Sequence, residues 1–185
     1  MTAHRSHRSG STRDLGLLLL RVGVGGALFA HGSQKLFGWF GGGGVDGTAE
    51  FLGSAGFEPP KLNATLAGVG EAGSGLLLAL GLGTGPAAAA ASATMVTAGS
   101  VHAPNGFFNT SGGYELPATY ALAATALALT GPGRISLDHA TGHALSRSGL
   151  TWLAYAGALA GAAYTIWSRR QTLEARADAP EDAAT

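Results

Sequence analysis

The longest uncharged stretch of the chain most constrains its fold. No Asp, Glu, Lys or Arg occurs between Ala72 and Tyr114, a stretch of 43 residues, and two further uncharged stretches follow at 116–133 and 148–168. An unpaired charge at the centre of a bilayer costs about 2.5 to 3.5 kcal/mol on insertion scales, so runs of this kind are typical of chains that fold in lipid. A soluble helical protein would carry a polar face instead. The charge distribution therefore predicts a membrane protein.

Composition supports this interpretation and excludes other classes of protein. Charged residues make up 12% of the 185 residues, well below the share of about 25% in soluble domains. Lys+Arg and Asp+Glu are equal at 11 each, so no basic excess exists to neutralise a nucleic-acid backbone, and no nucleic-acid partner is expected. Cysteine is absent, which excludes disulfides, thiolate nucleophiles and cysteine-ligated iron–sulfur clusters.

Five apolar segments have the length and composition of helices. They are residues 14–31, 62–81, 86–102, 116–131 and 149–168. Backbone groups in lipid must be satisfied within their own segment, and the alternation typical of barrel strands is missing, so each segment is predicted to be a helix. Residues 46–57, bounded by glycines and prolines, predict a short interfacial helix.

The sequence thus predicts an all-α protein, a multi-pass membrane four-helix bundle with an additional C-terminal fifth apolar helix. We divide the chain into a disordered basic N-terminus at 1–13, a four-helix membrane unit at 14–140, a loop and fifth apolar helix at 141–168, and a disordered tail at 169–185.

Charges at the segment ends bear on processing and orientation. Arg21 interrupts the first apolar segment and no good cleavage site follows, so we expect a retained span rather than a signal peptide. Because the first span usually sets the orientation, we expect the basic N-terminus inside, while the Lys and Arg count is even on the two sides. Arg169 and Arg170 leave open whether the fifth segment spans the membrane or lies in its interface.

Polar side chains gather at one end of the predicted bundle. If the first four helices cross alternately, the end of the first, the start of the second, the end of the third and the start of the fourth share one membrane face. The side chains on that face are His31, Gln34, Lys35, Lys61, His102, Asn105, Asn109 and Glu115. Such a concentration of titratable and amide groups is a candidate binding site.

Two opposite charges are predicted to meet deeper in the bundle. Arg21 lies ten residues before His31, and Glu71 lies nine residues after the start of the second segment. At about 1.5 Å per residue, both are roughly 15 Å below the same face. We predict an Arg21–Glu71 ion pair, because either charge alone would be costly in lipid. Helical spacing places Lys35 on the same stripe as Arg21, nearer the surface.

Each candidate also has an interpretation without chemistry. The Arg21–Glu71 pair can be a structural clamp. His31 can cap the end of a helix, and Glu115 can interact with the dipole of the fourth helix. His102 and Glu115 can close a loop by a hydrogen bond, or act as general acid and base in quinol-type proton transfer. His31, His102 and Glu115 lack the HxxH or HExxH spacing, so no metal site is predicted.

Four sequence blocks occur in a set order along the chain. They are Arg21 with HGSQKL at 31–36, GVGEAGSGLLLALGLGT at 68–84, HAPNGFF with GGYE at 102–115, and TGPGRISLD at 130–138. Together they resemble the DoxX family of small bacterial membrane proteins, over about residues 14–140. The resemblance implies a four-helix integral membrane unit. It also implies relatives that are membrane subunits of thiosulfate:quinone or quinol oxidoreductases, or membrane partners of soluble redox-defence enzymes.

The polar cluster and this resemblance lead to one functional hypothesis and one alternative. The chain is expected to be a membrane subunit of an oxidoreductase linked to the quinone pool, located in the bacterial cytoplasmic membrane, with quinone as the candidate cofactor and a soluble redox enzyme as the candidate partner. Candidates for catalysis are His102, Glu115 and Glu71, and candidates for substrate or quinone binding are Arg21, His31, Lys35, Glu71 and Asn105. The alternative is a non-catalytic membrane anchor or scaffold that recruits soluble redox or redox-defence enzymes. The oligomeric state stays open.

Overall fold

The structure, a computed structural model, describes residues 4–179, and it is all-α over them, as predicted. The helices are α1 (His4–Phe37), α2 (Gly44–Ser54), α3 (Pro60–Leu80), α4 (Thr84–His102), α5 (Glu115–Thr130), α6 (Leu137–Ala140) and α7 (Ser148–Ala177). Short 3₁₀ turns lie between them at Trp39–Gly41, Ala103–Asn105 and Asn109–Ser111. The short helix expected at 46–57 is α2.

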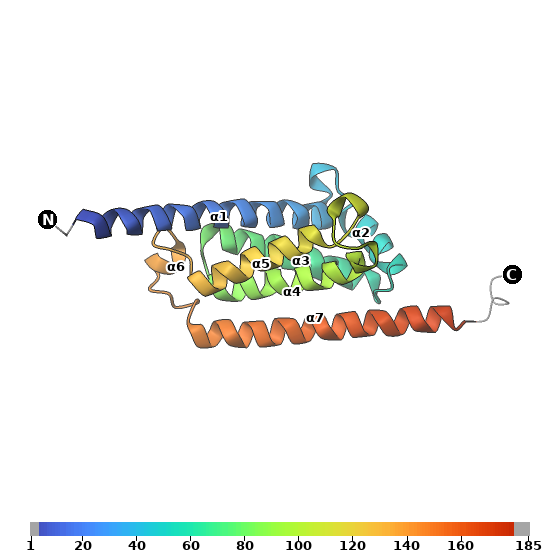
Figure 1. The fold of residues 1–185 in the computed structure, drawn as a ribbon. Helices are drawn as coiled ribbons and strands as arrows, with labels where there is room; N and C mark the ends of the chain where they lie inside the picture. Colours follow the sequence, from blue (N-terminus) through green and yellow to red (C-terminus); the bar gives the residue numbers. More distant parts are fainter. Residues whose placement is uncertain (1–3, 180–185) are drawn as a thin grey trace.

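The long helices run up and down along a common axis (Figure 1). α1 packs along α3, α3 along α4, and α4 along both α5 and α7, while the short α2 packs on α3 and α1. The ends of α1 and α4 and the starts of α3 and α5 therefore meet at one end of the molecule, as the sequence predicted. We call this the polar end. The core between α1, α3, α4 and α5 is filled by small and branched side chains, mainly Ala and Leu.

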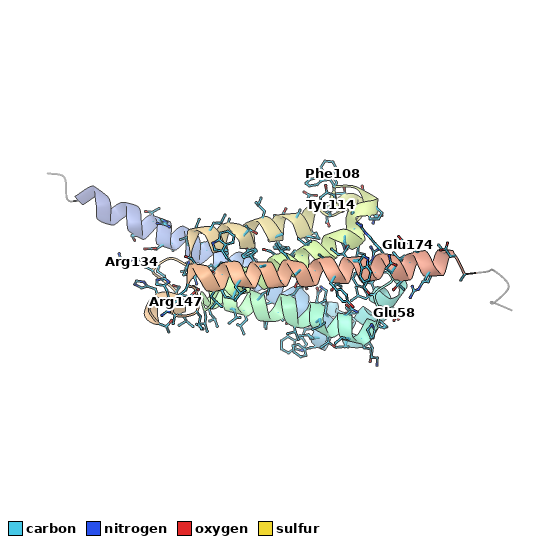
Figure 2. All side chains as sticks on the ribbon, turned by 90° about the horizontal axis from the view of Figure 1, so that it is seen from below. Glu58, Phe108, Tyr114, Arg134, Arg147 and Glu174 are labelled. Carbon is cyan, nitrogen blue, oxygen red and sulfur yellow. The ribbon has the colours of Figure 1, made fainter. Side chains whose placement is uncertain are left out.

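α7 runs parallel to α4 along the whole bundle, so that its C-terminal part reaches the polar end (Figures 1 and 2). Figure 2 shows Arg147 at the opposite end from Glu174. Near the start of α7, Thr151 lies against Gly85 of α4, where an added Cβ would overlap the threonine side chain. The fifth apolar segment is therefore packed on the bundle over its full length.

The helices extend further at both ends of the chain than the apolar segments suggest. Residues 4–13 and 169–177, which we expected to be disordered, continue α1 and α7. Residues 169–177 consist mainly of Arg, Glu, Gln and Ala, which are good helix formers, so loss of apolar character does not end α7 by itself. The remaining parts of the two expected disordered segments, 1–3 and 180–185, lie outside the described residues.

One segment in the described part of the chain, Ser11–Phe37 within α1, is long and apolar enough to cross a membrane by length and composition. α5 has only 16 residues, which is short for a span. α3 and α4 contain many Gly and Ala residues, whose hydropathy is low. The all-α class is thus confirmed over the described residues.

The contact between α1 and α3 depends on glycine. A Cβ added to Gly75 would lie 2.5 Å from the backbone nitrogen of Phe29 and 3.0 Å from the Cβ of Leu28. Leu28 itself is fully buried at this crossing. Small residues let helix backbones approach in this way, and the approach fixes the register of the two helices.

We expect the Gly75→Ala substitution to lower the free energy of unfolding by about 1–3 kcal/mol, because the added methyl group overpacks the crossing. Gly73 on the same helix has open space around the position of its Cβ. Gly73→Ala should therefore stabilise the protein by about 0.5–1 kcal/mol through helix propensity alone. Thermal unfolding of the detergent-solubilised variants measures both changes, and equal melting temperatures would contradict the close crossing.

Candidate functional site

A cavity of about 310 Å³ lies toward the polar end, between α2, α3, α4 and α7. Its apolar wall includes Phe51, Leu52, Phe57, Leu66 and Val101. Its polar lining consists of Lys35, Thr48, Asn63, Glu71, Thr94, Thr97, His102 and Thr165. This volume is at the lower end of the range of about 300–1,000 Å³ for small-molecule sites, which combine an apolar wall with a few polar groups.

Lys35 and Glu71 form an ion pair in the cavity wall. Lys35 Nζ donates a hydrogen bond to Glu71 Oε2 at 2.6 Å, and the side chains are 30% and 4% exposed respectively. Helical side chains lean toward the N-terminus of their helix, so Lys35 reaches back along α1 to the level of Glu71 on α3. Glu71 Oε1 has no hydrogen-bond partner among the described residues. The pair therefore leaves one carboxylate oxygen for a ligand.

The predicted Arg21–Glu71 ion pair is wrong. The contact of Gly25 with Gly75 sets the register of α1 against α3. In this register Arg21 lies against Gly81, where an added Cβ would overlap the guanidinium. Gly81 follows Glu71 by ten residues, about 15 Å along a helix. The two charges are thus at different depths.

The error came from setting the ends of the first two apolar segments, His31 and Leu62, at the same level. In the structure α1 continues to Phe37, and Gly32 lies against Gly68 and Ala72. The end of the first apolar segment is thus level with Glu71 rather than with Leu62. Lys35, one turn further along α1 and on the same stripe, reaches back to Glu71 and makes the ion pair.

Arg21 is instead buried at the opposite end of the bundle. Its side chain is 1% exposed, and its Nη2 donates a hydrogen bond to the carbonyl oxygen of Ile135. Its Nε and Nη1 are buried without a hydrogen-bond partner. The carboxylate that attracts this guanidinium electrostatically is Asp138. Arg21 does not line the cavity.

Asp138 is fully buried between α4 and the connection from α5 to α7. Its carboxylate accepts hydrogen bonds from the backbone nitrogens of Gly83 and Thr84, at 2.8 and 2.9 Å, and from the hydroxyls of Thr84 and Ser146. Burial raises the pKa of Asp138, but the hydrogen bonds from Ser146, Thr84 and Gly83 together outweigh it and hold the pKa below its ordinary value. Asp138 is therefore an ionised anchor for the start of α4.

The other candidates at the polar end stabilise the loop between α4 and α5. His102 Nδ1 and Asn105 Nδ2 lie 2.9 and 3.2 Å from the carbonyl oxygen of Gly112. Glu115 Oε2 accepts a hydrogen bond from the backbone nitrogen of Asn109 at 2.9 Å. His102 and Glu115 therefore contact loop backbone rather than each other. Only His102 among these three candidates also lines the cavity.

His31 lies within α1, so it does not cap the helix. Its Nδ1 is 3.2 Å from Gln34 Oε1, and its ring makes an edge contact with Tyr120 of α5 at 6.2 Å between centroids. These contacts orient the imidazole between α1 and α5, outside the cavity. Among the residues described, no group of three or more His, Cys, Asp and Glu side chains could hold a metal ion.

Sequence reasoning missed most of the cavity wall. Thr94, Thr97 and Val101 on α4 follow the spacing of one helix face, which is a signal that could have identified this wall. Ala158 and Ala162 of α7 form another part of the wall. They had no such signal, because the sequence did not determine which side of the bundle the fifth segment covers.

Comparison with known proteins shows a similarity over the first four helices. The DoxX family model matches residues 16–104, which include Lys35, Glu71 and His102. Comparison with curated proteins and with solved structures gave no match. The TGPGRISLD block at 130–138 and the helices α5 to α7 lie beyond the matched residues. The similarity to the DoxX family thus covers residues 16–104.

Proposed function

We propose that this chain is the membrane subunit of a quinone-linked oxidoreductase, and that the cavity binds the ring of a quinol. The observation that carries the proposal is the Lys35–Glu71 ion pair in the wall of a mostly apolar cavity. The apolar wall suits the ring and the start of its tail, and the polar groups suit the ring oxygens.

The hydrogen-bonding capacity of the wall favours the reduced form of the ring. Thr94, Thr97 and Thr165 each donate their hydroxyl proton to the carbonyl four residues earlier on their own helix, at 2.9, 3.0 and 2.9 Å. Their oxygens are therefore left as acceptors. With the free oxygen of Glu71, the cavity offers mainly acceptors, and a quinol presents two hydroxyl donors where a quinone presents none.

The proposed reaction needs a partner enzyme. When a quinol is oxidised to the quinone, its two O–H bonds break and it loses two protons and two electrons. Glu71 is placed to accept one of the protons, and His102, which lines the cavity beside the loop, is placed to accept the other, and both protons then leave toward the polar end. The electrons pass to the redox centre of a soluble oxidoreductase, because the chain has no cysteine with which to hold an iron–sulfur cluster.

Exposed aromatic side chains support a multi-pass arrangement in the bacterial cytoplasmic membrane. At the polar end they lie at the end of α1, in the loops that follow α1 and α4, and on α7. These residues are Phe37, Trp39, Phe40, Phe107, Phe108, Tyr114, Tyr164 and Trp167. Figure 2 shows Phe108 and Tyr114 together at this end. Trp152, near the start of α7, is 62% exposed. The 15 residues from Trp152 to Trp167 span about 22 Å, and aromatic belts at two membrane interfaces have this character. We therefore propose that α7 spans the membrane.

Direct binding tests the proposal. A short-chain benzoquinol and the matching benzoquinone are titrated separately against the detergent-solubilised protein, with detergent micelles as the blank. We expect saturable binding of both, tighter for the quinol, and bound quinone in lipid extracts of protein purified from native membranes. The proposal would be contradicted if neither the quinol nor the quinone bound. If soluble redox enzymes still co-purified in that case, the scaffold function would be favoured.

A further inference from the structure

We infer that α7, which lies beyond the residues that match the DoxX family model, determines the size of ligand that the cavity admits. The identity of the ligand as a quinol rests on the proposed function, whereas the role of α7 as a wall rests on geometry. The residues that set the size are Ala158 and Ala162, with Thr165 one turn further along.

The inner face of α7 carries small side chains. Ala158, Ala162 and Thr165 follow helical spacing, so they form one stripe that faces the cavity. Ala162 is 6% exposed, although α7 as a whole is largely exposed. Opposite this stripe, α3 contributes the larger Leu66 and the ion-paired Glu71. The width between the two walls is therefore set by the size of two alanine side chains.

The end of α7 is fixed to the rim of the same cavity. Arg169 Nε donates a hydrogen bond to the carbonyl oxygen of Ala55 at 2.7 Å, and its guanidinium lies 5.5 Å from the centroid of the Phe57 ring. Phe57 is 3% exposed and lines the cavity. The cation–π contact therefore holds α7 directly against a side chain of the cavity wall.

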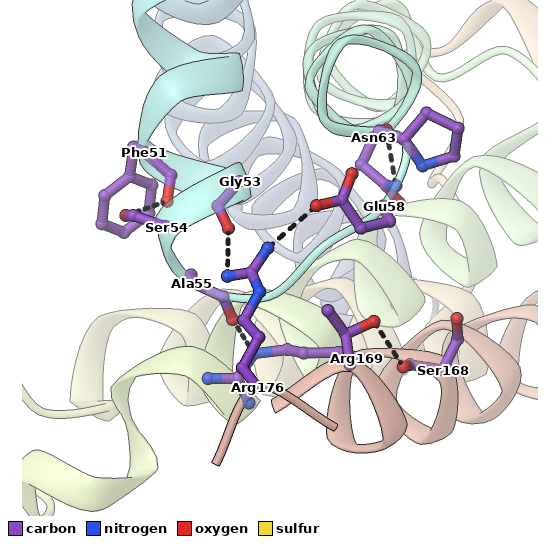
Figure 3. A network of polar contacts seen from close by, with 11 residues as sticks. Phe51, Gly53, Ser54, Ala55, Glu58, Asn63, Ser168, Arg169 and Arg176 are labelled. Atoms are coloured by element: carbon purple, nitrogen blue, oxygen red, sulfur yellow. Dashed lines mark hydrogen bonds and ion pairs between the residues drawn. The ribbon is translucent and has the colours of Figure 1, made fainter. Parts of the chain in front are cut away.

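A second arginine ties α7 to the same connection between α2 and α3. Arg176 Nη1 donates to the carbonyl oxygen of Gly53, and Nη2 donates to Glu58 Oε1, both at 2.9 Å (Figure 3). Figure 3 shows Arg169 and Arg176 converging on this connection from α7. Elsewhere α7 packs mainly along α4. The two arginines thus close the wall at the polar end.

The absence of cysteine allows a clean test that needs no quinone. Thr97→Cys introduces a single thiol into the cavity lining, and its rate of labelling is measured in the full-length protein with a small methanethiosulfonate reagent and with a bulky maleimide dye. Ala162→Leu is added to this background, and Ala163→Leu, at the exposed neighbouring position, is the matched control.

We expect Ala162→Leu to slow labelling by the bulky reagent about tenfold or more, because the reagent would overpack the narrowed cavity. The small reagent should be much less affected, and Ala163→Leu should change neither rate. Ala158→Leu, one turn away on the same stripe, should repeat the effect. Equal rates in the Ala162→Leu and Ala163→Leu proteins, or loss of reactivity toward both reagents alike, would overturn the inference.

Removing an arginine contact at the rim of the cavity gives an independent check, because labelling should then become faster rather than slower. Arg176→Ala is expected to speed labelling by the bulky reagent, whereas Arg170→Ala, at an exposed neighbouring arginine, should not. Protection of the thiol by benzoquinol is measured in the same samples. Size selectivity without protection by benzoquinol would contradict the proposed quinol site and leave the role of α7 supported. Protection without size selectivity would support the quinol site and contradict the role of α7.

Discussion

Replacing Asp138 with alanine is expected to destabilise the fold by about 3–5 kcal/mol, the range found when one partner of a buried charged group is removed. The substitution would leave the backbone nitrogens of Gly83 and Thr84 and the hydroxyl of Ser146 without their acceptor. It would also leave the buried guanidinium of Arg21 without its opposing charge. Thermal unfolding in detergent measures the loss. Asp46→Ala, which removes a carboxylate that is 84% exposed, should leave the melting temperature unchanged.

The pH dependence of stability distinguishes the charge of Asp138 from its shape. Because its pKa is lowered in the folded protein, its stabilisation is fully present above the unfolded carboxyl pKa of about 3.9 and is lost as the pH falls through the folded value. Asp138→Asn should therefore be less stable than the original protein at neutral pH, and the difference should shrink in acid. A difference that did not change with pH would show that the ionised form is not what stabilises the fold.

Glu71→Gln is expected to weaken quinol binding by about 10- to 100-fold. A hydrogen bond to a charged acceptor contributes about 1.5–3 kcal/mol, and each 1.4 kcal/mol is a factor of ten. Glutamine has nearly the same shape, and Lys35 keeps contact with solvent because its side chain is 30% exposed, so the fold should persist. Benzoquinol titration measures the affinity, with Glu50→Gln, at an exposed position of α2, as the matched control. Unchanged affinity in the Glu71→Gln protein would contradict the assignment of the site.

A double substitution separates binding from a purely structural clamp. A buried ion pair replaced by apolar residues of similar size often leaves stability unchanged or raised. The Lys35→Met and Glu71→Leu double variant should therefore recover most of the stability lost in the Glu71→Leu variant, but it should not recover quinol binding. Recovery of both properties would assign the pair to the fold alone.

The general fold could be predicted because it depends on local properties of the chain. The uncharged stretches and their Gly and Pro boundaries located α3, α4 and α5, and alternation of direction then placed the starts and ends of the helices at the polar end. The stripe of α1 that carries Arg21 and Lys35 faces α3, with Gly25 and Leu28 at the crossing.

Register and long-range packing could not be predicted in the same way. The prediction set His31 level with Leu62, whereas in the structure Gly32 lies against Gly68 and Ala72, and this change of register pairs Glu71 with Lys35 instead of Arg21. Polar residues such as those after His31 form helix readily, so the end of an apolar segment is a poor guide to the end of a helix. The anchor at Asp138 depends on unpaired backbone nitrogens at the start of α4, which no periodicity reveals.

The wall contributed by α7 also affects how such a site can diversify. α7 follows the other helices in the chain and is joined to them by the connection that precedes Ser148. Changes in the coding region for α7 can therefore reshape one side of the cavity while Lys35, Glu71 and the packing of α1 on α3 stay as they are. During synthesis α1 to α5 emerge from the ribosome before α7, so the cavity acquires its final dimensions only when α7 is in place.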